Sequence, residues 1–140
     1  MKIKYWLSEG GIAPTQATYG SVGFDLYATE RYSLDSDMPT TVETGVHLQI
    51  PEGYMGTIRG RSGLAFQGVN VHLGTIDSDY RGEVCVIMTS SDFYEVLKGE
   101  RVAQLVITEV PKVELEAVED LSELRETSRG EGGFGSTGRT

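Results

Sequence analysis

The sequence predicts an all-β domain, either a sandwich or a barrel, and three observations lead to that fold class. Apolar residues alternate with polar ones or form short β-branched runs, and clusters of turn-forming residues separate these runs. No segment keeps a 3.6-residue apolar period over several turns, so long helices are not expected. The chain has 140 residues, 39% of them hydrophobic and 24% charged, which suits one domain with a single core.

Three segments have the composition and period of strands: residues 41–50, 83–88 and 101–107. Turns are expected where glycine, proline, aspartate and serine gather, because these residues adopt turn conformations at low cost. Such clusters cover residues 33–39, 51–53, 77–82 and 98–100.

Helical structure is expected to be short, with about two turns at residues 61–67 and about one at 122–126. The end of the chain is different, since residues 130–138 hold five glycines and almost no side chain that could pack into a core. We therefore expect a β-rich domain over residues 1–126 and a mobile, glycine-rich C-terminal arm over residues 127–140.

The formal net charge is −9, from 12 Lys and Arg against 21 Asp and Glu. Sequence-independent binding of a nucleic-acid polymer requires a basic face, so this partner is not expected. The charge is uneven, because residues 109–126 hold seven acidic and two basic side chains, a net of −5. No apolar run approaches the roughly 18 residues of a membrane span, and no membrane association is expected.

The single cysteine, Cys85, excludes an internal disulfide and fits a reducing compartment. The start of the chain lacks the apolar stretch and cleavage site of a signal peptide, so a cytoplasmic location is expected. Cys85 lies within an expected strand and is predicted to be a small buried apolar residue. With His47 and His72 it does not supply the ligands of a zinc site.

Two further patterns are excluded by their context. Gly130–Gly135 has the G-x-G-x-x-G spacing of dinucleotide-binding folds, but only five residues follow it, which leaves no room for the required helix. Residues 77–82 are similar to the first half of a calcium-binding EF-hand loop, yet the twelfth position is Met88 instead of glutamate.

Five segments combine glycines, polar residues of catalytic type and aromatic residues in a manner that core packing does not require. They read SVGFDLYA at 21–28, GRSGLA at 60–65, GTIDSDYRGE at 74–83, GERVAQL at 99–105 and RGEGGFGSTG at 129–138. In this order they closely resemble the five motifs of the trimeric deoxyuridine triphosphatases (dUTPases). Each segment alone is common, but five in order within this length are specific.

The resemblance implies a jelly-roll-like β-barrel of the β-clip type and a homotrimer with shared active sites, each completed by a C-terminal arm. The implied reaction is the Mg²⁺-dependent hydrolysis of dUTP to dUMP and pyrophosphate. It removes dUTP from the nucleotide pool and supplies dUMP for dTMP synthesis.

The catalytic residues that the resemblance implies are Asp77 and Gln104. Hydrolysis at the α-phosphorus requires a water that is made nucleophilic and aimed in line with the leaving pyrophosphate. Asp77 matches the family's general base, and Gln104 matches a residue that holds the water and contacts the α-phosphate. From the residues alone, Asp77 could equally be a turn residue, and Asp79 or Glu83 could be the base.

Charge that develops on the phosphate oxygens must be met by fixed donors and cations. Arg61, Ser62 and Gly63 match the family's phosphate-binding motif, and Arg129 matches the ligand of the γ-phosphate. Asp25 matches a residue that holds magnesium indirectly through water. A purely structural role for the Asp25 carboxylate stays open.

Tyr80 matches the aromatic residue beneath the deoxyribose, and Phe134 matches the arm residue that stacks over the base. Residues 70–76 match a β-hairpin whose backbone reads the uracil edge, which rejects bases with mismatched hydrogen-bonding groups. Several family members have asparagine where this chain has Val71. The complete substrate-binding set implied by the resemblance is Arg61, Ser62, Gly63, Asn70, Val71, Gly74, Thr75, Ile76, Tyr80, Cys85, Arg129, Phe134, Gly135, Ser136 and Thr137.

Two alternatives stay open. A dCTP deaminase shares the fold and some phosphate motifs, but it would need a glutamate-centred site in place of the Gly74–Asp77 run. A nucleotide-binding regulatory protein on the same fold would keep the architecture without turnover.

Overall fold

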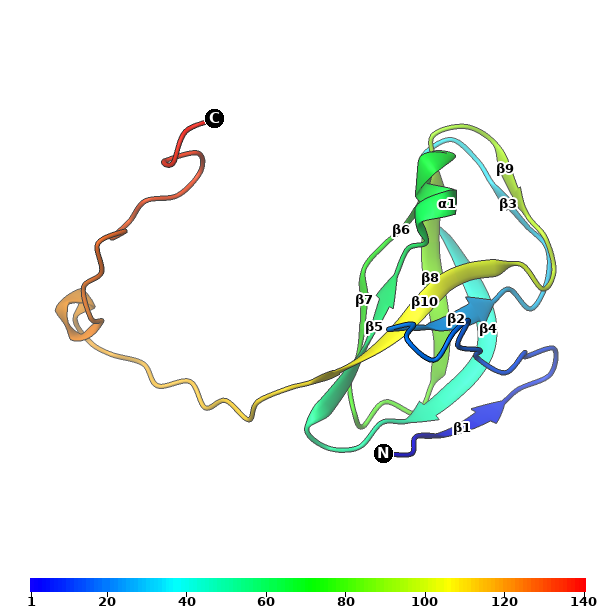
Figure 1. Cartoon of the computed structure of the whole chain (residues 1–140), viewed down its shortest axis with the longest axis horizontal. Coiled ribbons are helices and arrows are strands. Elements are labelled where there is room, and N and C mark those ends of the chain that lie inside the picture. The colour runs from blue at the N-terminus through cyan, green and yellow to red at the C-terminus, as the bar shows by residue number, and fades with distance from the viewer.

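Ten strands form two four-stranded antiparallel sheets and one two-stranded ribbon in the computed structural model, which describes residues 1–140 (Figure 1). The first sheet has the order β1 (Lys4–Leu7), β4 (Thr40–Gln49), β8 (Glu83–Ser90) and β6 (Val69–Val71). The second has the order β2 (Phe24–Tyr27), β10 (Arg101–Glu109), β5 (Tyr54–Arg59) and β7 (Gly74–Ile76). The ribbon pairs β3 (Tyr32–Leu34) with β9 (Tyr94–Val96). The all-β prediction is confirmed.

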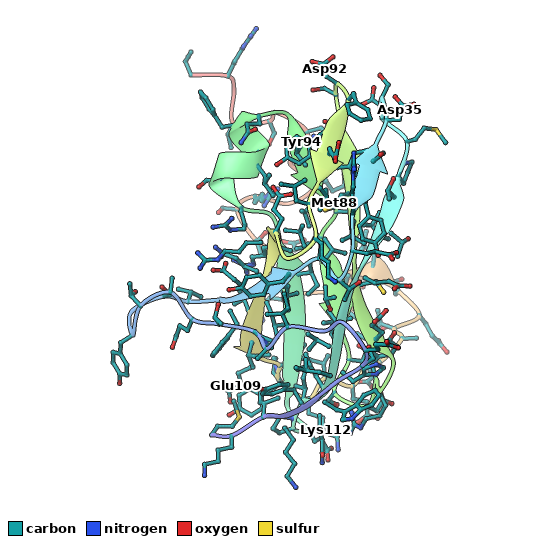
Figure 2. All side chains as sticks on the ribbon, turned by 90° about the vertical axis from the view of Figure 1, so that its right-hand side faces the viewer. Asp35, Met88, Asp92, Tyr94, Glu109 and Lys112 are labelled. Carbon is teal, nitrogen blue, oxygen red and sulfur yellow. The ribbon has the colours of Figure 1, made fainter.

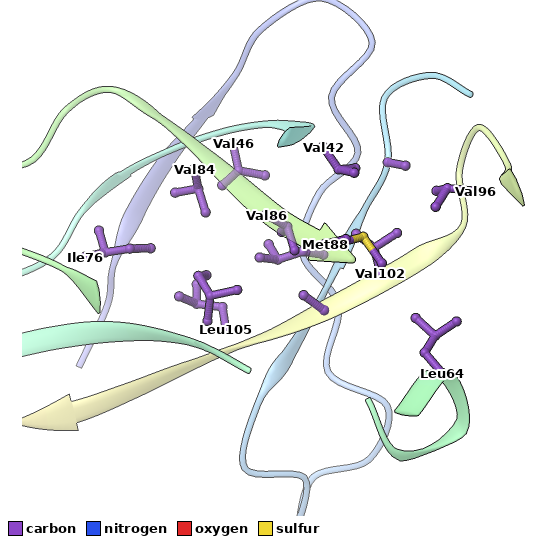
Figure 3. Close-up of a cluster of buried hydrophobic side chains, with 14 of the residues drawn as sticks. Val42, Val46, Leu64, Ile76, Val84, Val86, Met88, Val96, Val102 and Leu105 are labelled. Carbon is purple, nitrogen blue, oxygen red and sulfur yellow. The ribbon is translucent and has the colours of Figure 1, made fainter. Parts of the chain in front are cut away.

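The core lies between the two sheets. Val84, Val86 and Met88 alternate along β8 and are buried against Val102 and Leu105 of β10 (Figure 3). This period of two residues buries one face of each strand, as the sequence pattern requires. The three strands expected from that pattern are confirmed as β4, β8 and β10.

The structure differs from the sequence prediction in the segment 33–39. Ser33 and Leu34 belong to β3 and not to a turn, and Leu34 is fully buried. Burial of Leu34 and of Val96, which lies on the paired strand β9, outweighs the turn preference of the neighbouring serine and aspartate residues.

The two sheets do not close into the expected barrel. They form a jelly-roll-like sandwich in which β6 and β7 are edge strands of different sheets. Residues 70–76 are therefore not the expected hairpin, since β6 pairs with β8 and β7 pairs with β5. The chain crosses from one sheet to the other within this segment, and strand partners elsewhere in the sequence decide that crossing.

The two short helical segments lie outside the sheets. Helix α1 (Ser62–Phe66) follows β5 at one end of the molecule, and a single 3₁₀ turn, η1 (Leu121–Glu123), follows β10 (Figure 1). The α1 prediction is confirmed with slightly shorter bounds. The turn expected at 122–126 begins one residue earlier because Asp120 and Glu123 form a capping box there.

The C-terminal segment leaves the body of the subunit after β10. Figure 2 shows Glu109 and Lys112 at the end of the molecule opposite Asp35, Asp92 and Tyr94, and Figure 1 shows the following residues extending away from the sheets. Residues 108–131 and 134–140 are all exposed. No helix has the length and apolar character needed to cross a membrane.

Candidate functional site

Strand β5 borders two groups of candidate site residues: one lies beyond its C-terminal end, and the other lies along its partner strand β7, which pairs with residues 56–58. At the C-terminal end of β5, Arg59 pairs with Gln104 of β10, and Arg61 follows two residues later. Near its N-terminal end, Gly56 pairs with Ile76 of β7, which directly precedes Asp77. We call the first group the arginine cluster (Asp25, Arg61, Arg101 and Gln104) and the second the β7–β8 cavity.

A buried carboxylate organises the arginine cluster. Asp25 of β2 is 6% exposed and lies opposite Gln104 in the sheet. One of its carboxylate oxygens is 3.5 Å from Arg61 Nε and the other is 3.7 Å from Arg101 Nε. Arg61 Nη1 also donates to the Arg101 carbonyl oxygen at 3.4 Å. Because two guanidinium groups face one carboxylate, the cluster retains a positive charge, which suits an anionic ligand.

Arg61, Ser62 and Gly63 turn from β5 into α1. The Arg61 Nε atom is buried and has no hydrogen-bond partner, which leaves an unused donor beside Asp25. A Cβ placed on Gly63 would meet no atom within 4 Å, so the subunit itself gives no reason for a glycine here. Close approach of a ligand or of another subunit would give that reason.

Gln104 is held by a close contact with strand β2. A Cβ at Gly23 would lie 3.2 Å from the Gln104 Cβ and 3.3 Å from its Oε1. Gly23 therefore lets β2 approach the Gln104 side chain, whose position next to Asp25 follows from the register of β10 with β2.

The β7–β8 cavity has a volume of about 290 Å³ and lies between strands of the two different sheets. Its lining includes every residue from Gly74 to Asp77, together with Tyr80 and Cys85. Strand β7 is an edge strand, so half of its backbone N–H and C=O groups are not used by the sheet. These free groups can form hydrogen bonds with a planar polar ligand in the cavity.

Tyr80 is fixed across the turn that follows Asp77. Its hydroxyl donates to the Glu83 carbonyl oxygen at 2.9 Å. A Cβ at Gly82 would lie only 2.3 Å from that hydroxyl, so the ring position requires glycine at 82. The Tyr80 ring is thereby held at the cavity wall.

Cys85 is not the buried apolar residue that the sequence predicts. It lies on the face of β8 that borders the cavity, and its thiol donates to Glu83 Oε2 at 3.3 Å. Partial burial raises the pKa of the Cys85 thiol to about 12, and the Glu83 carboxylate contributes to that rise. The prediction failed because Val84 and Val86, its neighbours in the sequence, take the core-facing positions of the strand.

The carboxylates that competed with Asp77 in the sequence differ in their surroundings. Glu83 Oε1 accepts hydrogen bonds from the Gly45 N–H at 3.1 Å and the Ser8 hydroxyl at 3.3 Å. Glu83 is thus engaged in holding the loop before β2 against the sheet. Asp77 and Asp79 are both exposed and take part in none of the three ion pairs, but only Asp77 borders the β7–β8 cavity.

Asn70 and Val71 lie away from this cavity. Both belong to β6, where Asn70 pairs with Thr89, and Val71 packs against the core and against Gly60. A wider hollow of about 1220 Å³, near the N-terminal strand and the β4–β5 turn, shares only Asp77 with the predicted set. Its lining also includes Asp79, the alternative base, and the cationic side chains of Arg81 and Lys112.

The C-terminal arm makes no contact with either group in its own subunit. Arg129 Nε donates to the Gly132 carbonyl oxygen at 2.7 Å, which curls the arm locally. Phe134 is fully exposed and has a φ of 43°, and Gly135, Ser136 and Thr137 are exposed beside it.

The two groups are too far apart to act on one reacting atom within one subunit. Ile76 of β7 pairs with Gly56 of β5, so Asp77, the next residue, falls at the level of Met55. Arg59 lies four residues beyond Met55 along β5. At about 3.3 Å per residue these four steps span roughly 13 Å, and Arg61 lies beyond that point. A reacting atom needs its base and its phosphate ligands within hydrogen-bond reach, and this spacing does not bring Asp77 and Arg61 that close within one chain.

The carboxylates of the subunit do not form a metal centre. No group of three or more His, Cys, Asp or Glu side chains lies together, and both oxygens of Asp25 face arginines. This donor set fits only a magnesium ion that arrives on phosphate oxygens and keeps its waters, with one carboxylate beyond them.

The fold and the site define a class of protein: a β-sandwich with two arginines around a buried carboxylate beyond one end of β5, a small and mostly apolar cavity bordered by a carboxylate beside β7, and a free glycine-rich arm. The dUTPase family model matches residues 9–138. A deoxyuridine 5'-triphosphate nucleotidohydrolase of Anaplasma marginale is 48% identical over 136 residues, covering 89% of this chain and 88% of its own. The chain therefore belongs to the dUTPase family.

Solved structures agree with this assignment. A mutant dUTPase of Staphylococcus bacteriophage 80alpha with dUpNHpp has a TM-score of 0.89 at 26% identity, covering 99% of each chain. The fold also matches a mutant dUTPase from phage phi11 of S. aureus, described with a structural Mg(II) ion, at a TM-score of 0.82 and 23% identity. That match covers 86% of this chain and 99% of the phage protein.

Proposed function

We propose that this chain hydrolyses dUTP to dUMP and pyrophosphate. The observation that carries the proposal is the lining of the β7–β8 cavity, where Asp77, Tyr80 and the free edge of β7 meet. This combination brings together a carboxylate base, an aromatic wall and backbone groups that suit a pyrimidine. Membership of the dUTPase family supports the same substrate.

Asp77 acts as the general base in this mechanism. It takes a proton from a water molecule that attacks the α-phosphorus, while pyrophosphate leaves from the opposite side. Gln104 of another subunit holds the water and contacts the α-phosphate. The exposed position of the Asp77 carboxylate, without an ion pair, leaves it free for this role.

The arginine cluster binds the phosphate chain. Arg61 supplies guanidinium donors, Ser62 supplies a hydroxyl, and Gly63 lets its backbone N–H come close to a phosphate oxygen. Mg²⁺ bound to the triphosphate lowers the negative charge that the developing products would carry. Asp25 holds the two arginines in place, and its carboxylate would be the residue of this chain that holds the ion indirectly through water.

The arm closes the site from outside. Arg129 binds the γ-phosphate, Phe134 stacks over the base, and the hydroxyls of Ser136 and Thr137 add donors. Gly135 lets the chain turn there, since its φ is 86°. A homotrimer with shared sites accounts for the separation of Asp77 from Arg61 and for the absence of arm contacts within one subunit.

Base recognition uses the backbone of Gly74, Thr75 and Ile76. Their free N–H and C=O groups pair with the uracil edge, and cytosine would leave some of them unpaired. The Tyr80 ring packs beneath the deoxyribose and excludes a 2'-hydroxyl. A cytoplasmic location stays a prediction, and the single cysteine fits such a reducing compartment.

A panel of nucleotides tests the function. Purified protein with Mg²⁺ should release pyrophosphate from dUTP, and at least about 100-fold more slowly from dCTP, dTTP and UTP. These nucleotides differ from dUTP in the hydrogen-bonding edge of the base, a 5-methyl group and a 2'-hydroxyl, respectively. Removal of the metal with EDTA should lower the rate strongly. Ammonia release from dCTP would instead identify a deaminase, and no turnover of any nucleotide would identify a binding protein.

A further inference from the structure

The turn Asp77–Gly82, which we call the catalytic turn, is held partly by bonds within itself. The Tyr80 N–H donates to the Asp77 carbonyl oxygen at 3.2 Å. Arg81 Nη1 donates to the carbonyl oxygens of Ser78 at 2.7 Å and Tyr80 at 3.0 Å. These contacts shape the turn, but they do not fix it relative to the sheets.

One side chain from a distant strand binds the catalytic turn. His47 of β4 places its Nδ1 atom 2.9 Å from the Arg81 carbonyl oxygen. A carbonyl can only accept, so Nδ1 carries the proton and donates. The other side-chain hydrogen bonds of this turn are made by its own residues, and one of them, from the Tyr80 hydroxyl to the Glu83 carbonyl oxygen, joins the turn to the start of β8.

Trp6 supports the His47 ring from the other side. The two residues are directly opposite in the β1–β4 pairing, and their ring centroids are 5.0 Å apart at an interplanar angle of 59°. On the other neighbouring strand, His47 pairs with Glu83, the first residue of β8. The backbone of His47 is thus paired on both sides, and its imidazole packs against Trp6 while Nδ1 donates to the turn.

We propose that His47, supported by Trp6, is a positioning residue that sets the orientation of Asp77 for catalysis. The inference rests on the proposed function of Asp77. Because the Asp77 carboxylate has no ion pair of its own, the backbone of the turn decides its direction. A base displaced by about 1 Å loses much of its effect on the reaction rate.

Two substitutions of His47 test this role. His47→Leu removes the donor but keeps much of the volume, and His47→Asn offers an amide N–H near the place of Nδ1. We expect His47→Leu to lower kcat for dUTP about 10-fold with KM within threefold, and His47→Asn to recover most of kcat. Gln49→Leu is the matched control, because Gln49 lies two residues further along β4 and makes no side-chain hydrogen bond to the turn.

Limited trypsin cleavage after Arg81 gives a readout that does not depend on activity. Loss of the hydrogen bond between His47 and the Arg81 carbonyl oxygen should speed this cleavage several-fold in His47→Leu, but not in His47→Asn or Gln49→Leu. The melting temperatures of these three variants and of the unmodified protein are compared, so that general destabilisation is recognised. Unchanged kcat in His47→Leu, or equal loss in both His47 variants, would overturn the inference. If the unmodified protein does not hydrolyse dUTP, the proposed function of the site fails instead.

Discussion

Asp77 is exposed and unpaired, so its substitution by asparagine removes a base without removing a structural contact. We expect Asp77→Asn to lower kcat by about 10²- to 10⁴-fold, the usual contribution of a general base. The dissociation constant for a non-hydrolysable dUTP analogue should stay within about threefold, since the phosphate ligands are intact. Pre-steady-state turnover and calorimetric binding measure the two quantities. Normal turnover in this variant would exclude Asp77 as the base.

Cys85 should be a weakly reactive thiol although it borders the cavity. Its pKa is raised to about 12, while a free thiol has a pKa of about 8.5, so the native side chain stays protonated at pH 8.5. We expect native protein to react with iodoacetamide at least tenfold more slowly than urea-unfolded protein at this pH. Equal rates in the two states would contradict the raised pKa, and Cys85→Ser serves as the unlabelled control.

The same shift predicts how stability depends on pH. The unfolded chain loses the thiol proton first as pH rises, whereas the folded chain keeps it until about pH 12. The contribution of Cys85 to the free energy of unfolding is therefore complete below about pH 8.5 and is lost progressively above it. In urea unfolding at several alkaline pH values, the free energy of unfolding of the protein should fall relative to that of Cys85→Ser as pH rises.

At the scale of elements, Gly63 at the start of α1 is a residue whose substitution should affect activity without lowering stability. A Cβ added at Gly63 would meet open space, and the φ of this residue is ordinary, so Gly63→Ala fits the subunit and favours the helix by up to about 1 kcal/mol. We expect an unchanged or higher melting temperature together with a loss of at least tenfold in kcat/KM for dUTP. Gly20→Ala, also in open space, is the control that should leave both quantities unchanged.

At the scale of the whole molecule, the separated groups predict complementation between chains. Asp77→Asn retains the arm, and a chain that ends at Ser128 retains Asp77, so each alone should be nearly inactive. Mixed trimers, refolded together, should regain activity, because Asp77 of one chain can meet the arm of another. Gel filtration should show that the shortened chain still folds and assembles. Mixtures as inactive as their components would contradict shared sites.

The sequence predicted the three longest strands and both helical segments, because local patterns set them, but it left β1, β2, β5 and β9 unassigned. Alternation marked β4, β8 and β10, and the Arg61–Gln67 segment marked α1. The sequence pattern placed Ser33 and Leu34 in a turn, but they belong to β3, because burial of Leu34 outweighs the turn preference of its neighbours. It also placed residues 70–76 in one hairpin, whereas β6 and β7 belong to different sheets. Glu83 was visible only as an alternative base, since no local pattern shows its bonds to Ser8 and to Gly45 of β4, which are far from it in the sequence.

The sequence by itself determined the fold class, the order of the five motifs and the chemical character of the site, since residue type and spacing are local properties. Only the tertiary structure decided that Asp77 and Arg61 lie at opposite ends of β5, that Cys85 faces the cavity, and that His47 reaches the catalytic turn. These relations depend on strand register and on pairing between segments far apart in the chain, where a shift of one residue moves every side chain to the other face.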